Sequence, residues 1–183
     1  MSKIKVEQEP RETNLKGRMA ESLVFDLLKE SGNSVYKIGY ETILHGGSNL
    51  SGAFEKHARV AEKMRAIPDF FVIDKTNLPH LVEVKFRWSP KGHAEDLQKL
   101  SIIRKYWEEA NIIFVNCVEK PYFRFSHPPF IKPNKEIILL PLTVFKPFNI
   151  SDPLIRKFET LVEKYFTPTL TAGTRQKISK KPA

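Results

Sequence analysis

Asp69, Glu83 and Lys85 have the side-chain types and the spacing that a metal-dependent site requires. Held together, the two carboxylates repel each other, and all three groups lose hydration. A bound divalent cation offsets both costs. Carboxylate oxygens are also the ligands that Mg²⁺ prefers. Such a site requires that the chain bring these three side chains together.

A predicted β-hairpin provides that arrangement. Its strands, Phe70 to Asp74 and Leu81 to Phe86, are rich in Val, Ile and Phe, and the polar break between them suits a turn. Because side chains alternate along a strand, Glu83 and Lys85 share one face, and the alternating apolar residues face the core. Antiparallel pairing then brings Asp69, at the mouth of the first strand, close to both.

The pattern Pro68-Asp69, thirteen intervening residues and Glu83-Val84-Lys85 resembles the PD-(D/E)xK motif of the restriction-endonuclease-like nuclease superfamily. That superfamily includes type II restriction enzymes, archaeal Holliday-junction resolvases and phage nucleases. The resemblance is nearest in character to the resolvase-like and phage members, and it covers roughly Leu15 to Val118.

The resemblance implies a metal-dependent endonuclease that hydrolyses phosphodiester bonds in nucleic acid by in-line attack of a metal-activated water. It implies Mg²⁺ as cofactor, replaceable by Mn²⁺, with Asp69, Glu83 and the Val84 carbonyl as ligands. Lys85 would orient the attacking water and offset the phosphate charge, an electrostatic role that we favour over that of a general base.

Two further candidates for the catalytic site lie on predicted helices. Glu21, in the helix Asn14 to Leu28, lies at the edge of the buried face, about 20° around the axis from Leu28. A rim glutamate that reaches solvent is the plain alternative, whereas the resemblance implies that Glu21 binds the ion directly or through water. Gln98, in the first turns of the predicted helix 94–110, is the weaker candidate.

Basic residues around the hairpin are the predicted contacts to the nucleic-acid backbone. The segment 46–66, a Gly-rich loop and then a helix from Phe54, has no counterpart in the family scheme, and we interpret it as an insertion beside the hairpin. A solvated surface helix is the alternative to a substrate clamp. The predicted contacts are Lys56, Arg59, Lys63, Arg65, Arg87 and Lys91.

The order of elements predicts an α/β fold with a restriction-endonuclease-like core, α-β-β-β-α-β, in which helices flank a central mixed sheet. Residues 1–166 would form this single domain, with a strand and a helix added at its C-terminal end. Residues 111–118 form a continuous apolar run, which predicts a central or parallel strand. The tail 167–183 is basic and predicted to be disordered.

Outside this core, several segments carry more specific expectations. Residues 1–13 are predicted to be a loose arm, and 34–44 a first strand with a bend. The Pro- and aromatic-rich segment 119–134 is predicted to be a loop packed on the core, with stacking on bases as the alternative. A strand interrupted by Pro141 is expected at 136–145, and Asp152 is expected to cap a final helix.

Composition restricts the partners and the setting. The 183 residues carry a net charge of +9, of which +4 lies in the tail, and this favours a polyanion. We expect nucleic acid, DNA ahead of RNA, and a homodimer is left open. The sequence has no membrane-length apolar run and no signal-peptide core, and Cys117 is its single cysteine. These features predict an intracellular protein, cytoplasmic or nucleoid-associated and not secreted. The lone cysteine and five scattered histidines give no zinc-ligand spacing.

Two alternatives remain beside the endonuclease. One is a non-catalytic nucleic-acid-binding or assembly protein that retains the nuclease fold. The other is an unrelated α/β protein in which the motif arose by chance. Intact Asp69, Glu83 and Lys85 favour the endonuclease, because a module that only binds has no need of this costly cluster.

Overall fold

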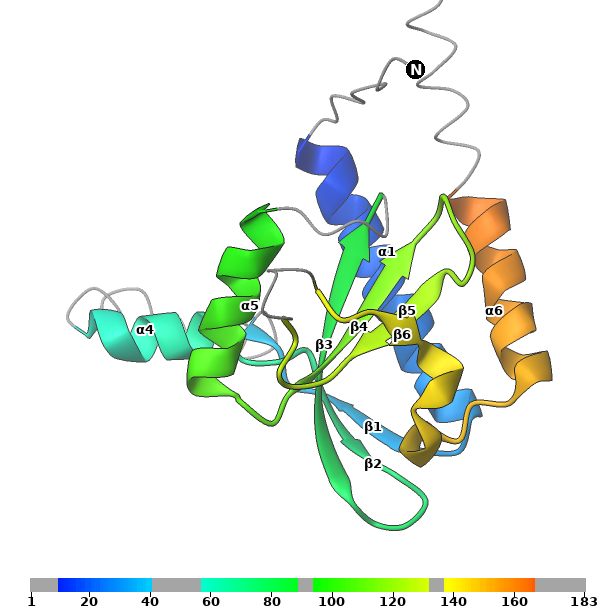
Figure 1. Ribbon diagram of the computed structural model, residues 1–183, viewed down its shortest axis with the longest axis horizontal. Helices are drawn as coiled ribbons and strands as arrows, with labels where there is room; N and C mark the ends of the chain where they lie inside the picture. Colours follow the sequence, from blue (N-terminus) through cyan, green and yellow to red (C-terminus); the bar gives the residue numbers. More distant parts are fainter. Residues whose placement is uncertain (1–9, 41–56, 89–93, 132–136, 167–183) are drawn as a thin grey trace, which may run out of the picture.

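A mixed sheet forms the centre of the computed structural model, which describes residues 10–40, 57–88, 94–131 and 137–166, with the side chains of 10–13 and 94–96 excepted. In this part of the chain the sheet has six strands in the order β1-β2-β3-β4-β5-β6, and helices cover both faces (Figure 1). The predicted α/β class, a mixed sheet flanked by helices, is confirmed at this level. None of the helices in these ranges combines the length and apolarity that a bilayer crossing requires.

The predicted hairpin is present as β2 (Phe70–Ile73) and β3 (Pro79–Arg87), paired antiparallel with Phe70 opposite Val82. Asp74 closes the turn: its Oδ1 accepts hydrogen bonds from the backbone N–H groups of Thr76 at 2.8 Å and Leu78 at 3.0 Å. Its Oδ2 lies 2.8 Å from His80 Nε2. These contacts fix the register of β3, and with it the position of every residue on that strand.

Strand β3 also pairs in parallel with β4 (Asn111–Asn116), every residue of which is buried. Parallel neighbours need a crossover connection, and α5 (Ala94–Tyr106) supplies it. The prediction of a central, parallel strand at this position is confirmed, although β4 ends two residues earlier than predicted. The helix also ends earlier than the predicted Ala110.

Helix α1 (Pro10–Glu30) and helix α6 (Asp152–Tyr165) pack together against one face of the sheet, and α5 covers the other (Figure 1). Helix α1 begins at Pro10, so the predicted loose arm 1–13 is wrong at its end, and Asn14 lies inside the helix and does not cap it. Pro10 explains the earlier start, because proline suits the first helical position. Helix α6 follows the prediction, except that Ser151 and not Asp152 is its cap residue.

The first strand, β1 (Ser34–Lys37), is shorter than the predicted 34–44, part of which lies outside the described residues. Contact with the hairpin continues past its last residue. The N–H groups of Ile38 and Gly39 donate to the backbone oxygen of Asp69, at 2.9 Å and 3.3 Å. The predicted insertion contributes α4 (Ala58–Arg65), which lies beside α5, and residues 46–56 are outside the described ranges.

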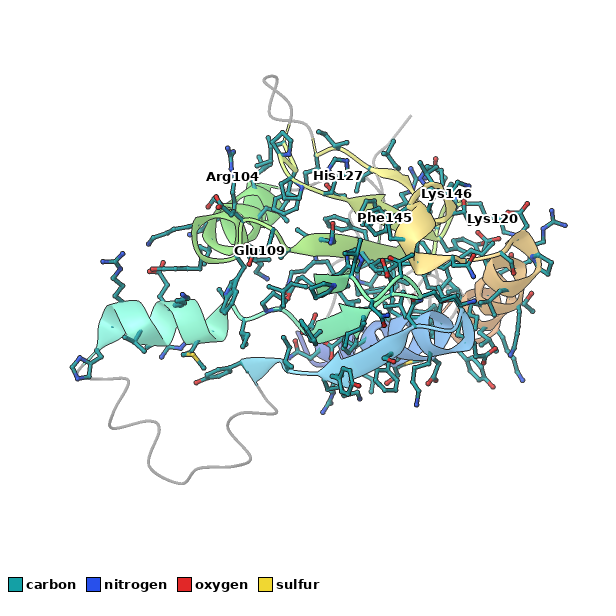
Figure 2. All side chains as sticks on the ribbon, turned by 90° about the horizontal axis from the view of Figure 1, so that it is seen from below. Arg104, Glu109, Lys120, His127, Phe145 and Lys146 are labelled. Carbon is teal, nitrogen blue, oxygen red and sulfur yellow. The ribbon has the colours of Figure 1, made fainter. Side chains whose placement is uncertain are left out.

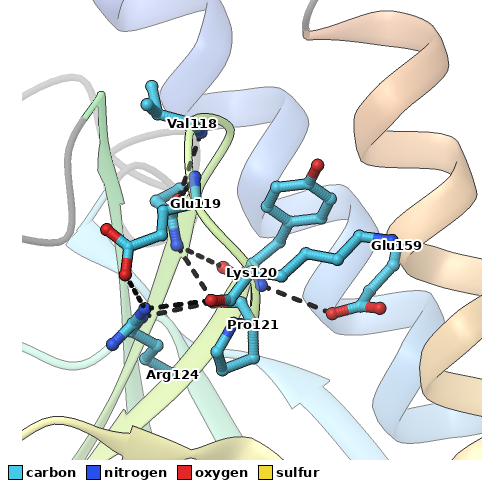
Figure 3. Close-up of polar contacts among 8 residues, drawn as sticks. Val118, Glu119, Lys120, Pro121, Arg124 and Glu159 are labelled. Carbon is cyan, nitrogen blue, oxygen red and sulfur yellow. Dashed lines mark hydrogen bonds and ion pairs between the residues drawn. The ribbon is translucent and has the colours of Figure 1, made fainter.

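The Pro-rich segment contains a strand that the sequence did not predict, β5 (Phe123–Ser126), paired antiparallel with β4. Its aromatic side chains pack into the core, so the predicted packing is confirmed and base stacking is not available to the buried rings of Phe123, Phe125 and Phe130. The turn before it is tied internally by Arg124, whose Nε donates to the Pro121 oxygen at 3.2 Å (Figure 3).

The predicted strand 136–145 is wrong for most of its length. Only β6 (Leu140–Pro141) pairs with β5, and two short 3-10 helices follow, η1 (Leu142–Val144) and η2 (Lys146–Phe148). Figure 2 labels Phe145 and Lys146 in this region. Prolines at 141 and 147 lack the N–H that a sheet ladder needs, which explains why pairing stops there.

Candidate active site

Asp69 is held at the mouth of the hairpin by contacts to its backbone and to its side chain. It directly precedes β2, and the register Phe70–Val82 places it opposite Glu83. Its Oδ2 accepts a hydrogen bond from the Val84 N–H at 2.7 Å, while its backbone oxygen accepts the two N–H groups after β1. The orientation of the Asp69 carboxylate is therefore fixed by β1 and β3 together.

Glu83 and Lys85 lie on one face of β3, as the alternation predicts. Their side chains are 9% and 21% exposed, and Lys85 Nζ forms an ion pair with Glu83 Oε1. Val84 points to the opposite face, where it is buried in the core beside α1. The structure thus brings the three residues of the predicted motif to one place.

The electrostatics of this cluster are set by burial. Loss of hydration is the main cause that raises the pKa of Asp69 well above the usual range, and the negative charge of Glu83 adds to it. Lys85 and the Val84 N–H act in the opposite direction, and Glu21 contributes a further small increase. Asp69 therefore belongs to an acidic cluster that lacks full charge compensation.

Glu21 reaches the same region from α1. It is half-buried and lines a polar cavity of about 470 Å³ together with Val84 and Lys85 of β3. The predicted placement of Glu21 on the helix facing the hairpin agrees with this geometry. The cavity also carries cationic side chains from three elements, Arg18, Arg87 and Lys99.

A second cavity of about 350 Å³ lies on the other side of Lys85. Glu62, Arg65 and Ala66 at the end of α4 form one wall, and Ile102 and Ile103 of α5 form another; Glu83, Lys85 and Lys99 complete the lining. Lys85 and Lys99 line both cavities, so the two recesses meet at Lys85 of the predicted motif and together form one groove.

Gln98 is not brought to the site. Its side chain is exposed and lines neither cavity, whereas the neighbouring Lys99 lines both. Both residues lie in the first turns of α5, and a shift of one residue, about 100° around a helix, decides which of them faces the groove.

The predicted nucleic-acid contacts divide into three groups. Arg65 and Arg87 line the cavities. Arg59 and Lys63 lie exposed on α4 outside both recesses, with Lys63 Nζ 5.1 Å from the centre of the Trp107 ring. Lys56 and Lys91 lie outside the described residues. The sequence analysis did not select Arg18 or Lys99, although both line the groove.

The donor set of the cluster fits a hard cation that keeps water ligands. Within the described residues, no three side chains of His, Cys, Asp or Glu converge tightly enough to hold a metal ion by themselves. Mg²⁺ is commonly bound through only one or two carboxylates, and Asp69 and Glu83 are the two that this cluster offers. The Val84 N–H is directed to Asp69, and because the N–H and C=O of a strand residue are directed to the same side, the Val84 carbonyl would be the third donor.

Similarity to known proteins is found among solved structures. No family model matches the chain, and no curated protein matches it. A solved structure with detectable similarity is that of Hjc, a Holliday junction resolvase from the archaeal hyperthermophile Archaeoglobus fulgidus. The two chains are 13% identical, the match covers 75% of this chain and 97% of Hjc, and the TM-score is 0.38.

Proposed function

We propose that this chain is a metal-dependent endonuclease of the PD-(D/E)xK type, which hydrolyses phosphodiester bonds in nucleic acid, with DNA as the expected substrate and Mg²⁺ as the expected cofactor. The observation that carries the proposal is the position of Asp69 opposite Glu83, with Lys85 paired to Glu83 and lining both recesses. Burying two carboxylates in this way is costly, and a bound cation removes the cost.

Each residue of the cluster has a defined task in this proposal. Asp69, Glu83 and the Val84 carbonyl would hold the cation, and Glu21 would contribute from the facing helix. A divalent cation bound there would lower the pKa of a water molecule and stabilise the negative charge on the phosphate. The Val84 N–H keeps the Asp69 carboxylate in one orientation, so little reorganisation is needed.

Lys85 has a separate task. It pairs with Glu83 and lines both recesses. When a phosphate enters, its ammonium can turn from Glu83 to a phosphate oxygen and position the attacking water. This electrostatic task needs a fixed positive charge close to the reacting atoms, which a lysine anchored on a central strand provides.

Cations along the groove would hold the rest of the substrate. Arg18 and Arg87 lie on the α1 side, Arg65 on the α4 side, and Lys99 between them. Contacts from arginine and lysine to phosphates position nucleic acid without reading its sequence. We therefore expect binding that depends strongly on salt and weakly on sequence.

A non-catalytic nucleic-acid-binding protein is the second candidate, because the basic lining of the groove would serve it equally. Incubation of the protein with supercoiled, linear, single-stranded and four-way-junction DNA and with RNA, in Mg²⁺ or EDTA, separates the two. Cleavage in Mg²⁺ that EDTA abolishes supports the endonuclease. Tight binding to the same substrates with no cleavage in Mg²⁺ or Mn²⁺ would leave the binding protein.

A further inference from the structure

The recess between α4 and α5 differs in chemistry from the polar recess on the α1 side. Part of its wall is apolar and comes from Ala66, Ile102 and Ile103. Its volume of about 350 Å³ falls in the range of sites that enclose small organic groups. One groove thus presents a polar, cationic side and a partly apolar side, with Lys85 and Lys99 common to both.

The acidic residues of this recess already have cationic or hydroxyl partners. Glu62 accepts a hydrogen bond from the Tyr106 hydroxyl at 2.5 Å and one from Lys105 Nζ at 3.1 Å. Glu83 is paired with Lys85. Arg65 and Lys99 add positive charge to the lining, so the recess suits an uncharged group attached to an anion.

The walls of the recess are held together before any ligand binds. The bonds from Tyr106 and Lys105 join the end of α5 to Glu62 on α4. The Trp107 Nε1–H also donates to the backbone oxygen of Lys63 at 3.4 Å. The recess is therefore preformed, and occupying it does not require α4 to be ordered at that moment.

An apolar wall without donors or acceptors can contact the flat face of a nucleobase, but it cannot read its edge. Inside a continuous duplex each base is stacked on both neighbours and offers no free face. A base can enter this recess only when its nucleotide is unpaired and unstacked. Because Glu83 and Lys85 line the same recess, the phosphate of that nucleotide would lie at the cluster.

We propose that the recess of Ala66, Ile102 and Ile103 receives the base of an unpaired nucleotide next to the cleaved phosphate. The substrate class is then single-stranded or branched nucleic acid in preference to continuous duplex. This inference rests on the proposed function and names its substrate class. The sugar–phosphate backbone follows the polar recess, while the base turns into the partly apolar one.

Binding in EDTA tests this separately from cleavage. The probes are a short labelled single strand and the same strand with abasic sugars at its central positions. Wild type should bind the normal strand about tenfold more tightly, which at about 25 cal/mol per Å² corresponds to roughly 55 Å² of apolar surface buried between one base and the aliphatic wall. Ile102→Glu, which places a carboxylate in the apolar wall of the recess, should abolish this difference, and Val60→Glu, which adds the same charge at an exposed position on α4, should retain it.

Cleavage in Mg²⁺ provides the second readout. Wild type should cleave single strands and flaps faster than a fully paired duplex of the same sequence. Equal binding of normal and abasic strands by wild type overturns the inference, and this comparison needs no variant to fold. Base-dependent binding without any cleavage rejects the proposed function but supports the base site. Cleavage of duplex and single strand at equal rates rejects the base site alone.

Discussion

Replacing Asp69 by asparagine measures the electrostatic cost of the acidic cluster. Asparagine keeps an oxygen that can accept the Val84 N–H, but it removes the charge. Burial and the charge of Glu83 raise the pKa of Asp69 in the folded protein, so the folded state binds the proton more tightly than the unfolded chain. The free energy of unfolding of the wild type should therefore fall as the pH rises from the ordinary carboxyl pKa, about 3.9, to the raised pKa of Asp69 in the folded protein.

The magnitude follows from a single proton. One group whose pKa differs between the folded and unfolded states changes the free energy of unfolding with a slope of at most about 1.4 kcal/mol per pH unit between the two pKa values. Asp69→Asn lacks this slope. In EDTA at neutral pH the variant should thus be more stable than wild type, and the two should approach each other below the ordinary carboxyl pKa.

Urea unfolding in EDTA at several pH values from about 4 to 7 provides the assay. Asp26→Asn, a change at an exposed aspartate of α1, controls for the loss of a negative charge in general. Adding Mg²⁺ at a hundredfold its dissociation constant should stabilise wild type by about 2.7 kcal/mol and the Asp69→Asn variant by less. Parallel pH curves for wild type and Asp69→Asn in EDTA would refute the account of this cluster.

Three more predictions concern the core, the thiol and the tail. Phe148→Ala, at a fully buried ring, should lower the free energy of unfolding by about 3–5 kcal/mol in urea, while Val144→Ala at an exposed position should change it by no more than about 0.5 kcal/mol. Burial raises the pKa of Cys117 to about 11, so alkylation at pH 8 should be much slower in the folded protein than in urea, and equal rates would contradict the burial. Deleting 167–183 should weaken nucleic-acid binding and flatten its salt dependence but leave turnover at saturating substrate nearly unchanged; loss of the chemical step would show that the tail does more than bind.

The hairpin and its cluster could be predicted because local rules determine them. Alternation places Glu83 and Lys85 together whatever the surrounding fold, and a turn of this composition fixes the register that brings Asp69 opposite Glu83. The placement of Glu21 required only the phase of one helix with a clear apolar stripe. These inferences need no knowledge of distant contacts.

The features that were missed depend on contacts between distant segments. Strand β5 is short and flanked by prolines, and only its pairing with β4 identifies it. The position of α4 depends on Glu62 meeting Tyr106, 44 residues later in the chain. The choice between Gln98 and Lys99 depends on the exact phase of α5, whose apolar stripe leaves that phase open by one residue.

The most direct test of the central claim is the single-turnover cleavage rate of Glu83→Gln on a substrate that wild type cleaves in Mg²⁺. Glu109→Gln is the matched control, because Glu109 is exposed in the turn after α5 and lines neither recess (Figure 2). We predict that Glu83→Gln loses at least about a hundredfold in rate, the scale expected for one group that stabilises transition-state charge, while it binds the substrate in EDTA as wild type does. Cleavage by Glu83→Gln at the rate of Glu109→Gln would contradict the assignment of this cluster as the catalytic site.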